Sequence, residues 1–263
     1  MTKPILQVSG LTMDFGGIRA LNHLDLNVHS GEIVALIGPN GAGKTTFFNC
    51  VTGIYYPTEG DVLLNNPKGG KTISLKGLKP NKVTEKGLAR TFQNIRLFSK
   101  MTVLENVMIG RHCRTHAFVI GAIFRPPKVR REEQEIMNIS YSLLEKTGLA
   151  QYANELAQNL PYGAQRRLEI ARALATEPIL LLLDEPAAGM NPQETMELVD
   201  LIKEISNDGQ AILLIEHDMK LVMTLSHKIY VMDYGKKIAE GDPAEIRSNP
   251  DVIKAYLGEG ADA

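Results

Sequence analysis

The stretch that decides the fold reads GPNGAGKT and spans residues 38–45. It fits the pattern G-x-x-x-x-G-K-[ST], in which glycines allow successive backbone N–H groups to surround an anion. The nearly continuous apolar run 32–37 before it is typical of a strand that is buried on both faces. We therefore predict a phosphate-binding loop between a buried strand and a helix that begins after Gly43, rather than a glycine-rich turn that merely joins the two.

Two acidic residues follow a second buried strand. The run 179–183 (ILLLL) leads directly into Asp184 and Glu185. Ligands of parallel sheets bind at the carboxyl ends of the strands, so Asp184 is the candidate that holds Mg²⁺ and Glu185 the one that polarises an attacking water. In the loop itself, Lys44 would reach the β- and γ-phosphates, and the Thr45 hydroxyl would ligate Mg²⁺. Without the phosphate loop, the two acids would be interpreted as solvated residues at a strand end.

Strand and helix patterns alternate along the rest of the chain. Apolar and polar residues alternate over 20–28 and more weakly over 6–15, on either side of Gly16-Gly17, which predicts an antiparallel β edge. Strands that alternate with helices imply a mainly parallel core sheet. We predict an α/β fold in one domain over residues 1–263, with a helical subdomain inserted at about 95–158 and a helical tail at 241–257. The remaining segments are strands at 62–64, 211–215 and 229–232, an exposed loop at 65–80, and helices at 103–111, 131–158, 166–175 and 243–257.

Composition excludes several classes of protein. The chain has 263 residues, with 29 Lys and Arg against 30 Asp and Glu, and the net charge of −1 gives no support to nucleic-acid binding. Its two cysteines, Cys50 and Cys113, cannot form a disulfide framework and fit a reducing compartment. The N-terminus has no apolar segment typical of a signal peptide. The longest apolar stretch, 117–124, is far shorter than the roughly 20 residues of a membrane-spanning helix, so we expect none.

Further motifs resemble those of ATP-binding-cassette (ABC) ATPases. The segment 160–167 (LPYGAQRR) opens a helix and is similar to the family's signature, LSGGQ or LSYGQQ. Gln93 resembles the Q-loop glutamine, His217 the switch histidine, and Phe15 the aromatic residue that stacks on adenine. Residues 188–191 fall at the D-loop. The order of these motifs agrees with the family from residue 5 to residue 257, which favours a P-loop NTPase with an ABC cassette fold.

The resemblance implies a site that is completed by a second cassette. Two cassettes would enclose two ATP molecules head to tail, with the phosphate loop of one facing the signature of the other. Because this chain carries one of each, it would pair with an identical or a related ATPase subunit. Glu185, His217 and Gln93 would be catalytic, and Thr45, Gln93 and Asp184 would hold Mg²⁺. ATP would contact Phe15, Gly38, Pro39, Asn40, Gly41, Ala42, Gly43, Lys44, Thr45 and Thr46, and the partner's ATP would contact Leu160, Gly163 and Gln165.

Three residues depart from the family pattern. Pro161 replaces the signature serine, so no hydroxyl is available there for the partner's γ-phosphate, although proline is tolerated in the first turn of a helix. Ala164 replaces a residue that is commonly polar. Asn191 replaces the usual D-loop aspartate, which puts coupling across the dimer in question. We expect the composite site that uses this signature to be weakened.

The C-terminal segment narrows the resemblance. Residues 241–258, together with the sequence TFQN at 91–94 and the long segment 111–131, are similar to the longer ATPase subunit of branched-chain amino-acid importers. The implied partners are a shorter ATPase subunit, two membrane permeases and, indirectly, a substrate-binding protein, with the chain on the cytoplasmic face of the inner membrane. The alternatives are the ATPase of lipopolysaccharide export, a soluble ABC ATPase without a transport role, and a small-molecule kinase that uses the same phosphate loop.

The segment 111–131 is basic and allows two interpretations. It contains six cationic residues and no Asp or Glu, which fits a solvated loop or a surface near the permease or anionic headgroups. Its apolar part, 117–124, would either contact a permease or belong to the core of the helical subdomain. The cationic residues are Arg111, Arg114, Arg125, Lys128, Arg130 and Arg131.

Overall fold

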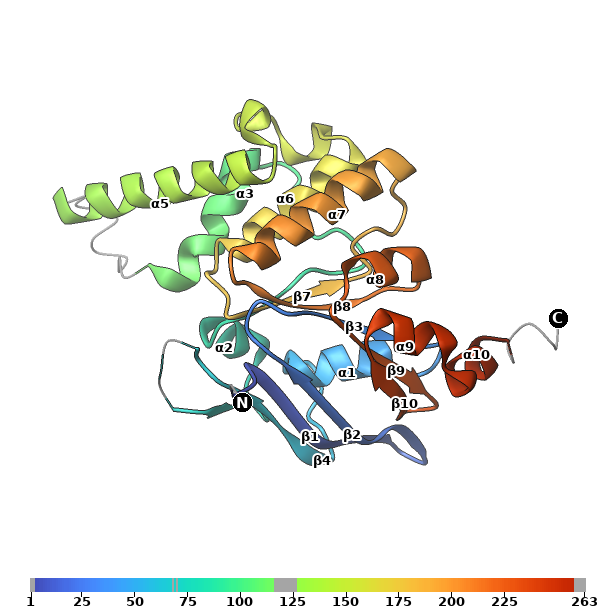
Figure 1. Cartoon of the computed structure of the whole chain (residues 1–263). Coiled ribbons are helices and arrows are strands. Elements are labelled where there is room, and N and C mark those ends of the chain that lie inside the picture. Colours follow the sequence, from blue (N-terminus) through green and yellow to red (C-terminus); the bar gives the residue numbers. More distant parts are fainter. Residues whose placement is uncertain (1–2, 68, 70, 116–126, 258–263) are drawn as a thin grey trace.

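A six-stranded sheet forms the centre of the molecule (Figure 1). The structure is a computed structural model that describes residues 3–67, 69, 71–115 and 127–257. All neighbouring strands of this sheet are parallel except the last pair, which is antiparallel. In spatial order the strands are β10 (Lys236–Gly241), β9 (Lys228–Asp233), β3 (Ile33–Ile37), β8 (Ala211–Ile215), β7 (Leu180–Asp184) and β6 (Leu88–Arg90).

A smaller antiparallel sheet packs against one face of the central sheet. Helix α1 (Lys44–Val51) contributes the fully buried rings of Phe47 and Phe48 to the hydrophobic core that both sheets share. The segment 65–80 is not simply an exposed loop, because its Leu75 is buried in this core and a short strand within it, β5 (Ile73–Ser74), pairs with β4 (Glu59–Leu64). In spatial order the strands of the smaller sheet are β2 (Ile18–Val28), β1 (Leu6–Phe15), β4 (Glu59–Leu64) and β5 (Ile73–Ser74).

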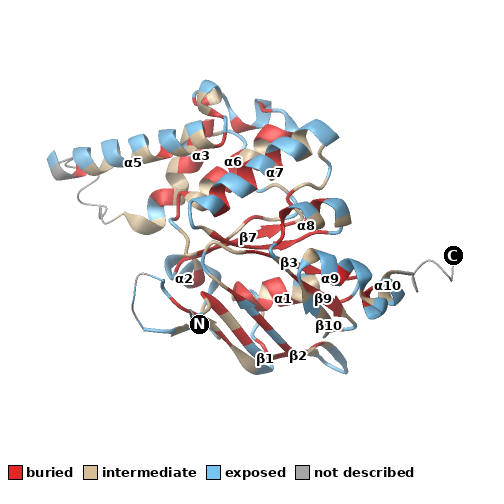
Figure 2. Ribbon diagram, viewed as in Figure 1, coloured by how far each residue is buried: buried red, intermediate tan, exposed pale blue. Residues whose placement is uncertain are grey.

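Helices cover the opposite face of the central sheet. Every residue of β3, β7 and β8 is buried, as expected for parallel strands covered on both sides (Figure 2). The covering core includes residues of α7 (Pro192–Asn207), α8 (Met219–Leu225) and α9 (Pro243–Ser248). The predicted tail helix 243–257 is in fact two helices, since α9 ends at Ser248 and α10 covers Pro250–Leu257.

A group of helices with its own hydrophobic cluster lies beyond this face, at the top of Figure 1. It contains α3 (Val103–Gly110), which begins at a Thr102–Glu105 capping box, α5 (Pro127–Lys146) and α6 (Tyr162–Leu174). The cluster extends past residue 158 into α6. The helix predicted over 131–158 was wrong at both ends, because α5 begins at Pro127 and stops before Gly148, which has a positive φ of 67°.

The predicted α/β class is confirmed: a mainly parallel core sheet, an antiparallel β edge and a helical group are all present. Among the described residues, no helix is both long enough and apolar enough to cross a membrane.

Short elements complete the fold. The short elements are α2 (Pro80–Glu85) and the 3₁₀ turns Arg111–Arg114, Ala150–Tyr152 and Ala157–Asn159.

The basic segment does not present all of its cations to solvent. Arg111 is buried and pairs with Glu177 at 2.5 Å. Arg114 donates to the carbonyl oxygens of Thr176 and Glu85 at 2.7 and 3.1 Å. These two arginines therefore fix the end of α3 to the core rather than forming a free basic surface. The apolar stretch 117–124 lies outside the described residues.

Candidate active site

The phosphate loop lies between β3 and α1, where two of its three glycines, Gly38 and Gly43, meet neighbouring backbone. A Cβ on Gly38 would lie 2.1 Å from the Met232 carbonyl oxygen, and one on Gly43 would lie 2.7 Å from that of Ala20. Any larger residue would push the loop off the sheet. The Lys44 ammonium donates to the carbonyl oxygens of Gly38 and Pro39 at 2.5 and 2.9 Å, so the lysine curls back over its own loop. The ammonium therefore lies against the glycine-rich loop, where a cation can neutralise a bound phosphate.

Phe15 ends strand β1 and is 42% exposed. Its ring meets Tyr55 edge to face, with 5.2 Å between the ring centroids. An exposed aromatic ring that is held by a second ring is suited to stack on a planar ligand. Its role toward adenine stays a prediction.

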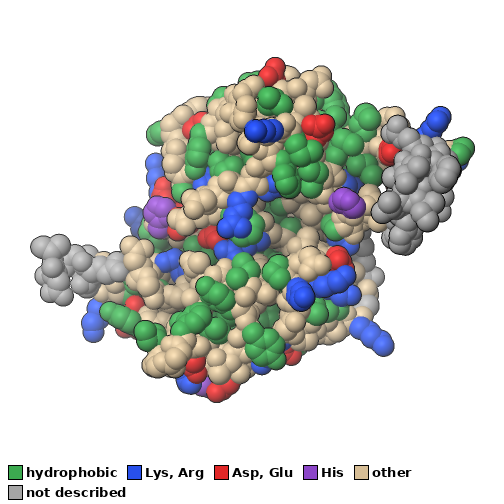
Figure 3. Space-filling model, turned by 180° about the vertical axis from the view of Figure 1, so that it is seen from behind, with side chains coloured by type: hydrophobic (Ala, Val, Ile, Leu, Met, Phe, Trp, Pro, Cys, Tyr) green, Lys and Arg blue, Asp and Glu red, His purple; other side chains and the backbone are tan. Residues whose placement is uncertain are grey.

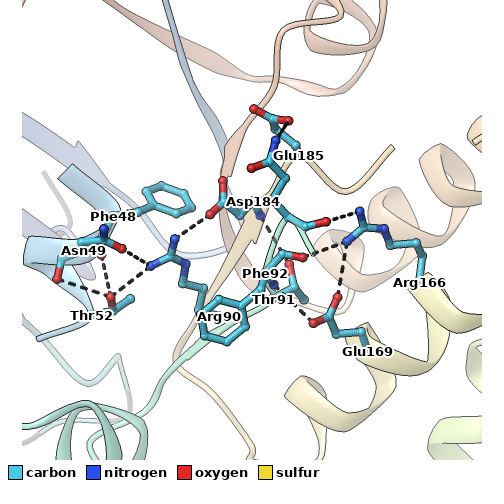
Figure 4. Close-up of polar contacts among 11 residues, drawn as sticks. Phe48, Asn49, Thr52, Arg90, Thr91, Phe92, Arg166, Glu169, Asp184 and Glu185 are labelled. Atoms are coloured by element: carbon cyan, nitrogen blue, oxygen red, sulfur yellow. Dashed lines mark hydrogen bonds and ion pairs between the residues drawn. The ribbon is translucent and has the colours of Figure 1, made fainter. Parts of the chain in front are cut away.

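Asp184, the last residue of β7, forms a buried ion pair with Arg90 of β6 (Figure 4). The Arg90 Nη2 atom lies 2.6 Å from the Asp184 Oδ2 atom, and both side chains are less than a tenth exposed. Arg90 also donates to the Asn49 side-chain oxygen of α1 at 2.8 Å. Its guanidinium lies 5.4 Å from the Phe48 ring centre and 5.1 Å from that of Phe92. Arg90 thus joins the helix of the phosphate loop to the strand-end carboxylate.

Glu185 brings together the three residues that were predicted to be catalytic. Its Oε2 atom accepts a hydrogen bond from the Gln93 side-chain amide at 2.7 Å and lies 3.9 Å from Nδ1 of His217. Its backbone has a φ of +47°, which is uncommon for a residue other than glycine and is typical of functional sites. The backbone N–H of Glu185 donates to the Ile215 carbonyl oxygen at 2.9 Å, which fixes this turn to β8.

A buried carboxylate that sequence reasoning missed supports this arrangement. The Glu216 side chain is 1% exposed and accepts from the backbone N–H groups of Ala187 at 3.0 Å and His217 at 3.2 Å. Burial raises the pKa of this carboxyl above its ordinary value, and the two backbone hydrogen bonds oppose that effect. Glu216 therefore joins the loop after Glu185 to His217, in the turn between β8 and α8. The pattern gave no signal for it, because an acid after a strand is most often solvated.

The signature lies on the other side of the central sheet from the phosphate loop of the same chain. Helix α1 belongs to the core on one face, whereas Ile170 and Ala173 of α6 pack into the core on the other (Figure 1). Pro161 is the N-cap of α6 and makes no side-chain cap hydrogen bond. The N–H of Gly163 donates to the Glu194 carboxylate at 3.2 Å. One chain therefore does not bring its own two motifs together.

Two other residues of the motif regions have structural partners. The Gln165 side-chain amide donates to the Leu160 carbonyl oxygen at 2.9 Å, which closes the turn that leads into α6. Asn191 caps α7 in a capping box with Glu194, and each of the two hydrogen bonds measures 3.0 Å. Asn and Asp are equally good N-caps, so the Asn191 departure leaves the start of α7 intact.

Oxygen ligands suited to Mg²⁺ occur at the junction of α1 and β7. Thr45 and Asn49 are four residues apart and share one face of α1. Asn49 is hydrogen-bonded to Arg90, which holds the Asp184 carboxylate, so the helix that carries Thr45 is joined to the end of β7. Mg²⁺ prefers one or two carboxylate or hydroxyl ligands and takes the others from phosphates and water. The donor set fits that ion.

Comparison with known proteins agrees with this geometry. The family model described as "ABC transporter" matches residues 21–188, and the model "Branched-chain amino acid ATP-binding cassette transporter" matches residues 236–262. The chain is 50% identical over 260 residues to the high-affinity branched-chain amino acid transport ATP-binding protein LivG of Escherichia coli K12, covering 98% of this chain and 100% of LivG. It is equally similar to the corresponding protein BraF of Pseudomonas aeruginosa, with the same coverage.

Solved structures give the same result. The ADP conformation of MJ1267, an ATP-binding cassette of an ABC transporter, superposes with a TM-score of 0.83 at 31% identity, over 98% of this chain and 100% of the other. The dimeric structure of MJ0796, a bacterial ABC transporter cassette, gives 0.73 at 26% identity, over 90% and 98%.

The fold and the paired motifs define an ATP-binding cassette, a class of nucleotide-binding ATPase. More particularly, the chain belongs to the ABC transporter family, whose ATP-binding proteins hydrolyse ATP to drive transport.

Proposed function

We propose that this chain is the ATP-hydrolysing subunit that powers the import of branched-chain amino acids through partner permeases. The observation that carries the proposal is the 50% identity to LivG and BraF over essentially the whole length of each chain. The C-terminal segment 236–262, which lies outside the general ABC match, also fits a model specific to branched-chain amino acid transporters. No comparable observation favours the alternatives of lipopolysaccharide export, a soluble ABC ATPase or a kinase.

In this proposal the phosphate loop holds ATP and the strand-end residues act on it. Lys44 and the loop amides neutralise the phosphates, while Phe15 stacks on adenine. Glu185 orients and polarises the attacking water, and His217 contacts the γ-phosphate. Mg²⁺, when bound, would neutralise charge that develops between the β- and γ-phosphates, held by Asp184, Thr45 and Gln93.

A second cassette would complete the site. The phosphate loop and the signature lie on opposite faces of the sheet, which supports this proposal. The signature of one chain would therefore not reach an ATP molecule held by the phosphate loop of the same chain. Leu160, Gly163 and Gln165 would face the partner's ATP. The partner would be an identical or a related ATPase subunit, and the pair would sit beneath permeases on the cytoplasmic face of the inner membrane, served by a substrate-binding protein.

On the face that Figure 3 shows, the cationic, anionic and hydrophobic side chains of the described residues are interspersed, and these residues form no extended region of one charge. Together with the net charge of −1, this supports protein partners over nucleic acid.

Uptake by reconstituted vesicles tests the proposal. The chain is purified with the membrane proteins that accompany it and reconstituted into vesicles. ATP is supplied on the side of the membrane where this chain lies, and labelled leucine, isoleucine or valine is supplied on the other side. We expect ATP-dependent accumulation of label that Lys44→Ala abolishes. Accumulation that persists in Lys44→Ala would contradict the role of the phosphate loop. ATP turnover without uptake of any of the three amino acids would contradict the substrate.

A further inference from the structure

Two buried residues on the signature helix hold the backbone of the Q-loop. Arg166 and Glu169 lie one turn apart on α6, and their side chains are 3% and 2% exposed. Arg166 donates to the Phe92 carbonyl oxygen at 2.8 Å and also to the carbonyl oxygen of Gln93. Glu169 accepts from the backbone N–H groups of Phe92 at 3.3 Å and Arg96 at 3.4 Å. The side chains of α6 therefore form hydrogen bonds with both the carbonyl oxygens and the N–H groups of the Q-loop backbone (Figure 4).

Burying the charged side chains of Arg166 and Glu169 costs desolvation free energy. The closest charged atoms of Arg166 and Glu169 are 3.6 Å apart, and burial raises the pKa of the Glu169 carboxyl, although Arg166 and the two amides oppose this. Burying two charges is costly unless they are paired and also hydrogen-bonded. Here four of the extra hydrogen bonds go to the backbone of the Q-loop, and Arg166 makes one more to Tyr162 of α6. Burying this pair therefore fixes the loop to the helix.

Tyr162 connects α6 to a second loop, the one that follows Glu185. Its hydroxyl donates to the Ala188 carbonyl oxygen at 2.9 Å and accepts from Arg166 at 2.9 Å. Ala188 follows Glu185 in the same loop, and its N–H donates to the Glu185 carbonyl oxygen. The first two turns of α6 thus contact both loops that carry the Gln93–Glu185 hydrogen bond.

We propose that Arg166, Glu169 and Tyr162 are positioning residues that couple the signature helix to the Gln93–Glu185 pair. A shift of α6, such as a second cassette would impose by docking on its N-terminus, moves the Q-loop backbone with it. The Gln93 amide then moves relative to the Glu185 carboxylate. This inference rests on the proposed function, because it assigns to these residues an effect on ATP hydrolysis.

Kinetics of the full-length chain, assembled with its partners, test the inference. Arg166→Lys keeps the charge but loses the planar fork that reaches two carbonyls. We expect kcat for ATP to fall about tenfold while KM stays within about twofold, because misplaced catalytic groups lower turnover without loosening the phosphate loop. In a Gln93→Ala background the same substitution should lower kcat no further, since it acts through Gln93. An equal fall in both backgrounds would overturn the inference.

Hydrogen exchange supplies a readout that does not depend on activity. Arg166→Lys should speed exchange of the amides of Phe92 and Arg96, whereas the control Glu197→Gln should not. Glu197 pairs with Arg167 of the same helix at 2.6 Å and does not contact the Q-loop among the described residues. Unchanged exchange in Arg166→Lys would contradict the claim that this residue holds the Q-loop backbone in place.

Tyr162→Phe gives a second variant if Arg166→Lys does not fold. It removes one hydroxyl from a side chain that is 41% exposed, so it should fold normally and show the same fall in kcat at constant KM. A parent-like kcat in a folded Tyr162→Phe protein would overturn the link to the Glu185 loop. An inactive parent would instead indicate that the proposed function is wrong, so the two failures are distinguishable.

Discussion

At the scale of single residues, the site depends on charges that are buried next to the motif side chains. Lys44, Asp184 and Glu185 could be predicted as site residues from their places in a loop or at a strand end, and His217 from its resemblance to the switch histidine of the family. Arg90 and Glu216 could not. Their roles arise where side chains from elements distant in sequence meet, such as Arg90 of β6 with Asn49 of α1 and Asp184 of β7.

Removing the cation of the Arg90–Asp184 pair should destabilise the fold. Arg90→Gln leaves a buried carboxylate without its partner, and we expect the free energy of unfolding to fall by about 3 kcal/mol. Urea unfolding monitored by circular dichroism measures this. Arg19→Gln is the matched control, because the Arg19–Asp14 pair has a similar distance of 2.8 Å but is solvent-exposed, and its loss should have little effect. Equal effects of the two substitutions would contradict a special role for burial.

Pro161→Ser tests the prediction that Pro161 weakens the composite site. A serine at the N-cap of α6 could accept a hydrogen bond from the first turn, which stabilises a helix by about 1 kcal/mol, and would restore a hydroxyl for the partner's phosphate. We expect a higher unfolding temperature and faster ATP turnover by the assembled protein. If the variant is more stable but turns over ATP no faster than the parent, the missing hydroxyl does not limit the composite site.

At the scale of elements, long and apolar segments were predictable and short or polar ones were not. The strands β3, β7, β8 and β9 are continuous apolar runs, and the sequence pattern identified each of them. Strand β6 has three residues, and β10 is largely polar (KKIAEG) because it lies at the sheet edge beside β9 alone. Neither produces a pattern of its own, and only pairing with a neighbour defines it.

Cys50 lies on α1, between the two sheets, and its burial there predicts that its thiol reacts slowly with alkylating agents. Burial raises the pKa of this thiol to about 11, so the thiolate that reacts with alkylating agents is scarce at neutral pH. In a Cys113→Ser background, which leaves Cys50 as the one thiol, iodoacetamide at pH 8 should label the native protein at least about 100-fold more slowly than the urea-unfolded chain. Comparable rates would show that α1 is not enclosed as described.

At the scale of the whole molecule, the separation of the phosphate loop and the signature within one chain supports the proposal that two chains share each ATP site. The phosphate loop projects from the carboxyl edge of the core sheet beside α1, and the signature begins a helix that packs on the opposite face. The sequence indicated both motifs and their order. It could not show that Arg166 and Glu169 join the signature helix to the Q-loop, because nothing in the spacing distinguishes an inward-facing ion pair from a solvated one.

The most direct test of the central claim, that ATP held by the phosphate loop is hydrolysed only between two cassettes, is the mass in solution of Glu185→Gln with and without ATP. This substitution keeps an oxygen that accepts from Gln93 but removes the carboxylate that we propose polarises the attacking water. We predict that light scattering after gel filtration will show a species with two cassettes, of identical or related chains, only when ATP is present, with ATP retained intact. A single cassette at saturating ATP, or turnover at the parent rate by Glu185→Gln, would contradict the account.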